Sequence, residues 1–174
     1  MDDNHLEIKT LGFDEALDIL AQLLLKSNRQ LSDLQWTSIH KVFENTTEIY
    51  PLHVKLLFDI SSKWTSSYKV PDEFSECISS KDTIKFLFKN LEQLYGKILF
   101  SHCIFYLTLF DYKGISEREL EDILSIDDDV LTSVFEYHHP SVRRFPIALW
   151  VRIKYELKDY ITNKETDGVP VISW

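Results

Sequence analysis

The chain has 174 residues, which is enough for one medium domain or two small ones. Hydrophobic residues make up 44% of it and aromatic residues 13%, which favours a packed core and argues against intrinsic disorder. The formal net charge of −9 argues against a general binder of nucleic acids or anionic membranes, because both partners are themselves negative.

The cysteines and the apolar segments favour a cytoplasmic protein. Cys77 and Cys103 are the only two cysteines, too few for a disulfide framework or a cysteine-based metal site, so we expect reduced thiols. The first four residues include Asp2 and Asp3, so the N-terminus is acidic where a secretory signal would be basic. The most apolar run, residues 98–110, is shorter than the ~20 residues that a membrane-spanning helix needs.

The first part of the chain carries three predicted helices. Apolar spacing predicts a helix over 14–26 with Leu17, Leu20, Leu24 and Leu25 on one side. The next two helices have clear start signals, a capping box at Ser32–Gln35 and a proline at position 51, and the second helix should end near residue 44. Segment 65–75 is polar and contains a proline, so we predict one domain over 1–78 and another over 79–174.

The second part contains four more predicted helices and a final strand. The helices are expected over 80–95, 117–124, 130–137 and 147–161, with an apolar segment over 98–112 and a strand over 169–174. In the first of these helices, Ile84, Leu87, Phe88, Leu91 and Leu94 should face inward. A capping box at Ser116–Glu119 and a cap at Asp127 frame two short helices, so the order of elements predicts a winged helix.

Several short motifs occur in a fixed order along the chain: Asn28–Leu31, Gln35–Trp36, Tyr50–Leu57, Trp64–Tyr68, Gly114–Leu131 and Arg144–Arg152. In this order they resemble the helical lid and the winged helix of NACHT-type STAND ATPases, the NACHT and WD-repeat proteins. The resemblance implies a mainly α fold, with a helical lid bundle over 1–78 and a winged-helix domain with a short terminal strand or hairpin over 79–174.

The resemblance also implies a regulatory role in signal transduction. In the family, the lid and the winged helix clamp the ADP-bound off state and rearrange when ATP is exchanged for ADP. Pro51 matches the family's proline against the adenine, so we expect it to contact ATP or ADP in an intact parent protein. The partner would then be the nucleotide-binding domain of the parent chain, with other protein partners or self-association as further expectations.

The chain has no phosphate-binding P-loop. Such a loop needs two glycines five positions apart followed by Lys and Ser or Thr, and Gly12, Gly96, Gly114 and Gly168 do not allow it. We therefore expect no catalytic residue, no metal site and no cofactor in this chain alone, and we interpret it as a regulatory fragment of a longer protein that is itself an NTPase.

One basic cluster stands out in an acidic chain. It consists of Arg143, Arg144, Arg152, Lys154 and Lys158. The simplest interpretation is a solvated helix face with salt bridges. The sharper hypothesis is that Arg143 and Arg144 contact the nucleotide-binding domain.

Other candidate sites have structural explanations. We expect Asp127–Asp129 to cap a helix, because carboxylates are stabilised by the free amides at a helix N-terminus. His102 and Cys103 lie in an apolar segment and are expected to pack in the core. His138 and His139 are adjacent and most simply form a solvated helix end.

Two alternative functions compete with the switch. A DNA-binding winged helix would read DNA with residues 130–137, but residues 116–139 hold eight acidic side chains and one basic side chain, Arg118. A protein–protein adaptor with an apolar groove fits the sequence as well as the switch does. An enzyme is the least favoured class, because no nucleophile–base pair or cofactor loop is recognisable.

Overall fold

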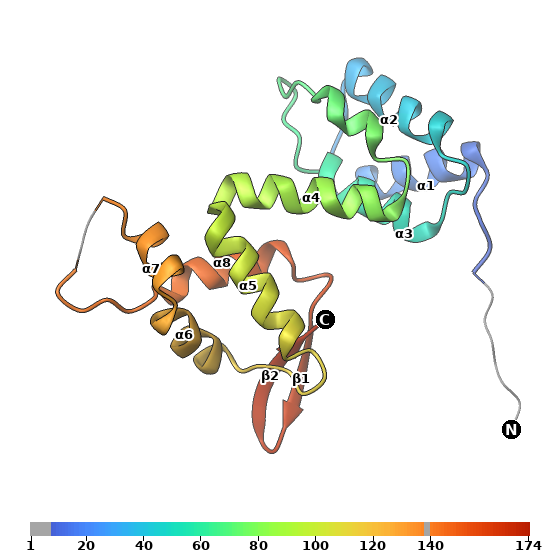
Figure 1. Ribbon diagram of the computed structural model, residues 1–174. Coiled ribbons are helices and arrows are strands. Elements are labelled where there is room, and N and C mark those ends of the chain that lie inside the picture. Colours follow the sequence, from blue (N-terminus) through green and yellow to red (C-terminus); the bar gives the residue numbers. More distant parts are fainter. Residues whose placement is uncertain (1–7, 138–139) are drawn as a thin grey trace, which may run out of the picture. The chain divides into compact units, whose positions relative to one another are not determined.

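The computed structural model describes residues 8–137 and 140–174, and helices dominate it (Figure 1). Eight α-helices and one two-stranded hairpin form in this described part, which confirms the predicted mainly α class with a terminal hairpin. The chain divides into two compact units, which we call unit 1 (residues 1–88) and unit 2 (residues 89–174). Since compactness is not the same as independent folding, the predicted domain boundary after residue 78 stays a prediction.

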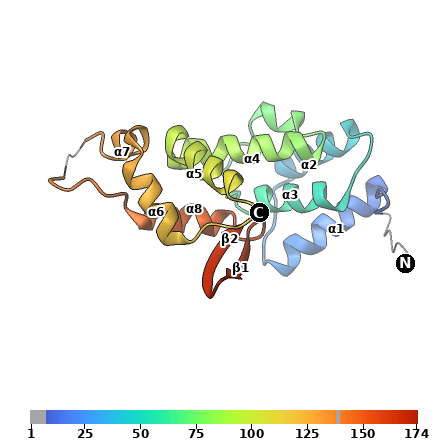
Figure 2. The ribbon, with the colours of Figure 1, turned by 60° about the horizontal axis from the view of Figure 1, so that its bottom comes forward.

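Unit 1 is a bundle of helices (Figure 2). Its elements are α1 (Phe13–Lys26), α2 (Asp33–Asn45), α3 (Pro51–Ser61), the short 3-10 helix η1 (Asp72–Glu76) and the first part of α4 (Ser80–Tyr95). Helix α1 packs against α2 and α3, and α2 packs against η1. The predicted capping box starts α2, because Ser32 Oγ accepts from the Gln35 amide at 3.4 Å and Gln35 Oε1 accepts from the Ser32 amide at 3.0 Å.

The core of unit 1 is apolar and follows most of the predicted helix faces. Its largest buried side chains are Leu20, Leu24, Ile39, Phe43, Leu56, Leu57 and Phe74. Two predictions are wrong: Leu25 is 70% exposed, and Ile84 of α4 is also exposed. In α1 the buried residues Ala16, Leu20 and Leu24 lie four positions apart, and Leu25 is turned about 100° away from that row.

The loop after α3 is held by side chains from the first half of unit 1. The buried Gln35 amide group donates to the carbonyls of Thr65 at 2.9 Å and Tyr68 at 3.2 Å. Arg29 Nε donates to the Ser62 carbonyl at 2.6 Å. Trp64 is buried and stacks on Tyr68, with ring centroids 5.8 Å apart. Motif residues that are far apart in sequence therefore converge on one loop.

Unit 2 contains helices followed by a hairpin (Figure 1). Its elements are the rest of α4, then α5 (Lys97–Leu109), α6 (Glu117–Ile126), α7 (Asp128–Val134), α8 (Ile147–Glu156), β1 (Thr162–Thr166) and β2 (Val169–Ser173). The strands are antiparallel, with Thr166 opposite Val169. Asp167 and Gly168 between them both have positive φ, +52° and +76°, as a tight hairpin turn requires.

A third short segment joins this hairpin. Ile115 forms an isolated antiparallel bridge with Ile172 of β2, through N–H···O bonds of 3.0 and 2.9 Å. The side chains of Ile115, Trp150 and Ile153 are buried in the core of unit 2. Leu94, predicted to face inward, is instead 66% exposed.

Two helices of unit 2 are shorter than predicted. Helix α7 was expected over 130–137 but ends at Val134, and the predicted helix end at His138 and His139 lies outside the described residues. Helix α8 was expected to reach residue 161 but ends at Glu156, where a turn leads into β1. In each case apolar spacing continues past the last helical residue, so periodicity alone could not locate the end.

Candidate functional site

The N-terminus of α3 carries the residue implied to contact a nucleotide. Tyr50 is the N-cap and makes no side-chain hydrogen bond to the helix, and Pro51 occupies the first turn as predicted. Tyr50, Pro51 and Leu52 are all exposed, so this end of the helix presents apolar side chains to solvent. The arrangement leaves the Pro51 ring accessible to a flat ligand, but its contact with adenine stays a prediction.

His53 follows directly and is buried. Its Nε2 lies 2.8 Å from the Cys77 carbonyl, so Nε2–H donates there, and Nδ1 has no hydrogen-bond partner. Burial lowers the pKa of His53, more strongly than the Cys77 carbonyl and Asp82 raise it. His53 also packs edge-on against Phe43, with ring centroids 6.1 Å apart. A neutral imidazole therefore fixes the start of α3 to the segment before α4.

The two candidate arginines have different surroundings in unit 2. Arg144 Nε lies 2.6 Å from Glu121 Oε1, and its Nη2 lies 3.0 Å from Asp122 Oδ1, so its guanidinium bridges two carboxylates of α6. These carboxylates raise the pKa of Arg144. Arg143 is exposed, and its neighbour Val142 is exposed as well.

The segment that carries both arginines is fixed to α6 at a second point. The Phe145 amide donates to Ser125 Oγ at 3.0 Å, and the Phe145 side chain is buried. Arg144 thus stabilises its own unit, whereas Arg143 points into solvent beside it. The same role was predicted for both arginines, because the sequence does not reveal that Arg144 has partners more than 20 residues away.

A second polar network in unit 2 centres on Asp127. Its Oδ1 accepts from the Val130 amide at 3.2 Å, which is the predicted cap of α7. Its Oδ2 lies 2.7 Å from His102 Nδ1 and accepts from the Tyr106 hydroxyl at 2.8 Å. Burial raises the pKa of Tyr106 to about 12, and Asp127 adds to that shift. The carboxylate therefore ties α5 to the start of α7.

The cysteines are not set up for nucleophilic chemistry. Cys77 and Cys103 are both buried, and burial raises the pKa of each thiol to about 12. Such thiols are protonated at neutral pH. Among residues 8–137 and 140–174, no three His, Cys, Asp or Glu side chains are grouped so that they could hold a metal ion. No helix of this part is long and apolar enough to cross a membrane.

The chain is similar over nearly its whole length to segments of much larger proteins. NACHT domain- and WD repeat-containing protein 1 of Homo sapiens is 30% identical over 96% of the chain. NACHT and WD repeat domain-containing protein 2 of Mus musculus is 30% identical over 99% of the chain. The chain spans only 10% of the length of each of these relatives. No protein-family model and no solved structure matches it.

Proposed function

The chain is a relative of the NACHT and WD repeat-containing proteins and corresponds to one segment of them, and on that premise we propose that it is a nucleotide-dependent switch module. Unit 1 would be the lid over a nucleotide that a neighbouring domain holds, and unit 2 would be the winged helix that keeps the off state closed. The observation that carries the proposal is the order of elements in unit 2.

That order is helix, bridge, three helices and hairpin. In a winged helix, a short strand after the first helix pairs with the last strand of the hairpin. Helix α5, the Ile115–Ile172 bridge, helices α6 to α8 and the β1–β2 hairpin follow this scheme. The hydrogen-bonded pairing of Ile115 with Ile172 of β2 favours a winged helix over a helical bundle to which a hairpin is merely attached.

In a winged helix of this topology, DNA would be read by a different helix from the one that the sequence predicts. The helix next to the hairpin is α8, not the predicted helix over 130–137. Helix α8 carries Arg152 and Lys154, but Lys154 is paired with Glu117 of α6 at 2.7 Å. With one of these two cations already paired and a chain charge of −9, we propose that nucleic acid is not the partner.

The switch proposal predicts different roles for Arg143 and Arg144. Arg143 would contact the nucleotide-binding domain of the parent, because it is exposed beside a segment that Arg144 and Phe145 fix in position. Reversing both charges in a full-length parent should loosen ADP retention. The single change Arg143→Glu should account for most of the faster ADP release, whereas Arg144→Glu should mainly lower the stability of unit 2. Unchanged release in the double variant would contradict this role.

The switch itself is tested by titrating labelled ADP and ATP against this chain and against a longer chain that includes a P-loop domain. Binding by the longer chain alone is the expected result, since Pro51 alone offers one contact and no phosphate ligands. Tight binding to the 174-residue chain would contradict the proposal that the nucleotide is held elsewhere. Absence of binding in both would favour the adaptor.

The adaptor is the second candidate, and one observation favours it. Phe105 and Leu109 of α5 lie four positions apart and are 59% and 61% exposed. Ile98 lies about two turns before Phe105 on a similar face and is also exposed. Exposed apolar rows of this kind occur at protein–protein contact sites. Two results together would support the adaptor function. Neither this chain nor the longer chain would bind ADP or ATP, and this chain would self-associate in a way that Phe105→Ser abolishes.

A further inference from the structure

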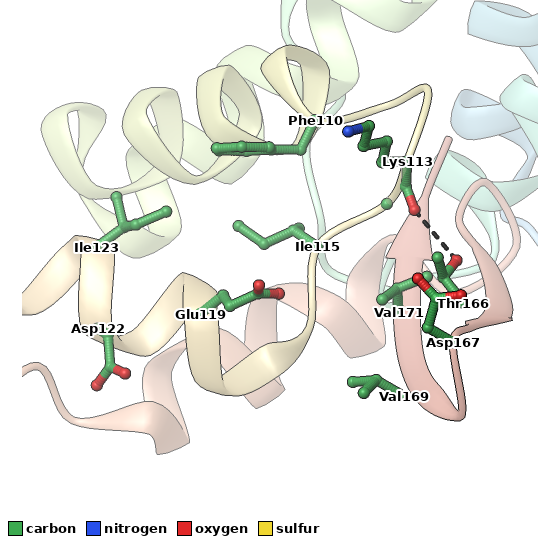
Figure 3. Close-up of a pocket in the computed structure, with 11 residues that line it drawn as sticks. Phe110, Lys113, Ile115, Glu119, Asp122, Ile123, Thr166, Asp167, Val169 and Val171 are labelled. Carbon is green, nitrogen blue, oxygen red and sulfur yellow. Dashed lines mark hydrogen bonds between the residues drawn. The ribbon is translucent and has the colours of Figure 1, made fainter.

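Unit 2 contains a pocket that none of the predicted site residues occupies. It has a volume of about 540 Å³ and lies between the end of α5, the first turns of α6 and the hairpin (Figure 3). Its apolar lining consists of Phe110, Ile115, Ile123, Val169 and Val171. Figure 3 shows Phe110, Ile115 and Ile123 grouped on one side, with the strand residues Val169 and Val171 on the other.

The walls of this pocket are fixed by the backbone. Gly114 has a φ of +77°, and a Cβ on it would lie 2.6 Å from Val171 Cγ2, so only glycine allows β2 to come this close. The two hydrogen bonds between Ile115 and Ile172 hold the adjacent residues in register. The Thr166 hydroxyl donates to the Lys113 carbonyl at 3.4 Å and ties the hairpin to the loop before α6. The pocket is therefore formed before any partner arrives.

The rim of the pocket is acidic. It includes three carboxylates, Glu119, Asp122 and Asp167, and one cation, Lys113. Glu119 accepts from the Ser116 amide and hydroxyl, which lower its pKa, so it is ionised at neutral pH. Asp122 is paired with Arg144. Among the described residues, Glu119 and Asp167 form no salt bridge within 4 Å. The pocket therefore combines an apolar lining with exposed carboxylates.

We propose that this pocket binds a basic segment of a partner protein, with one aliphatic side chain in the apolar lining and a flanking Lys or Arg beside Glu119 and Asp167. The charge of the rim selects the occupant, because a neutral or acidic segment would leave these carboxylates unpaired. The pocket opens to solvent along one side, which suits a chain segment better than an enclosed small molecule. The proposal does not depend on the nucleotide switch.

The test uses the full chain, labelled for amide NMR, and a short peptide with a central leucine flanked by two arginines. At low salt we expect saturable shifts at Gly114, Ile123 and Val169. A peptide with serine in place of leucine, and one with glutamates in place of the arginines, should each produce weaker shifts. Added salt should weaken the binding of the leucine–arginine peptide, because salt screens the charges at the rim of the pocket.

Two variants and a control make the test specific. Asp167→Asn keeps a residue that tolerates positive φ and removes one rim charge, so it should weaken binding roughly two- to fivefold. Val169→Arg fills the mouth with a cation and should abolish binding, while its amide spectrum reports whether the fold is kept. Asp128→Asn changes an exposed carboxylate outside the pocket and should have no effect.

The outcomes separate clearly. Shifts confined to the pocket that depend on both leucine and arginine support the proposal. Equal binding of the three peptides, shifts centred on another surface, or no shifts at several millimolar peptide would overturn it.

Discussion

Two glycines of unit 2 have almost the same backbone conformation and different surroundings. Gly114 and Gly168 have φ values of +77° and +76°, so an alanine at either is strained by about 1–2 kcal/mol. At Gly168 nothing lies within 4 Å of an added Cβ, whereas at Gly114 the Val171 side chain lies 2.6 Å away. The comparison isolates the effect of close packing from that of backbone strain.

Gly114→Ala should therefore destabilise the chain more than Gly168→Ala does. We expect about 1–2 kcal/mol for Gly168→Ala and a further ~1–3 kcal/mol for Gly114→Ala, because β2 must move away from the loop. Urea unfolding of the two variants measures both losses. Equal losses would show that β2 does not pack on Gly114 as described.

The carboxylate of Asp127 should make stability depend on pH. Burial tends to raise the pKa of Asp127, but hydrogen bonds from His102, Tyr106 and the Val130 amide outweigh it and hold the pKa below its usual value. A carboxyl group whose pKa is lower in the folded state stabilises the fold above its unfolded pKa. This contribution disappears as the pH falls through the folded value.

Asp127→Asn keeps a good N-cap residue and removes the charge. At neutral pH it should cost about 1–2 kcal/mol, since charge-assisted hydrogen bonds are lost, and the difference from the natural chain should vanish in acid below the folded pKa. Denaturant unfolding at several pH values gives this difference. Glu165→Gln in the fully exposed strand β1 serves as the control and should show no such pH-dependent loss. A cost for Asp127→Asn that is constant with pH would contradict the ionic role.

At the scale of elements, the loop after α3 depends on one buried amide. Gln35 donates to two carbonyls of that loop, and its own side chain is buried. Gln35→Glu replaces this donor by a carboxylate that faces the carbonyls of Thr65 and Tyr68. We expect a loss of roughly 2–4 kcal/mol, from the unmade hydrogen bonds and the buried charge.

Thermal unfolding followed by tryptophan fluorescence measures this loss, and Trp64, which packs in the same loop, contributes to the signal. Gln35→Met matches the length of the side chain without the charge and should cost less than Gln35→Glu. Thr37→Val on the exposed face of α2 is the control and should change stability little. A Gln35→Glu chain as stable as this control would mean that the loop is held by its aromatic contacts alone.

Local signals predicted where helices begin, and distant contacts decided the rest. Ser32, Pro51, Ser116 and Asp127 each start a helix as the sequence predicts, because a cap acts within four residues. Strand β1 had no local signal: its five residues are polar and all exposed, and it is a strand because β2 pairs with it. The partners of Arg144 and the lining of the pocket likewise depend on residues far apart in sequence.

At the scale of the whole molecule, α4 decides where the chain can be divided. The division between the units lies inside this helix, and its first turns belong to the core of unit 1. Phe86 packs edge-on against the buried Phe74, with ring centroids 5.5 Å apart. The Thr83 hydroxyl is buried and lies 3.4 Å from the Cys77 carbonyl, which also accepts from His53. Removal of α4 would expose these groups.

A chain cut after residue 95 should therefore fold, and a chain cut after residue 78 should not. In the shorter piece Phe74 loses its contact with Phe86 and the Cys77 carbonyl loses a hydrogen-bond donor, at a cost of about 3–5 kcal/mol, comparable to deleting a large core side chain. That is a large part of the total stability of a small domain. Far-UV circular dichroism and urea unfolding of both pieces give the comparison.

Cooperative unfolding of the 1–95 piece together with a sparsely helical 1–78 piece would show that unit 1 includes half of α4. Because α4 runs without interruption from Ser80 to Tyr95, a change in the conformation of its second half would then be transmitted along the helix to Phe86, and from there through Phe74 to Trp64 in the loop after α3. If the 1–78 piece folds as stably as the longer one, the predicted boundary after residue 78 is right, and α4 belongs to unit 2 alone. In that case the proposed switch would have to act through the segment before α4, where His53 Nε2 donates to the Cys77 carbonyl.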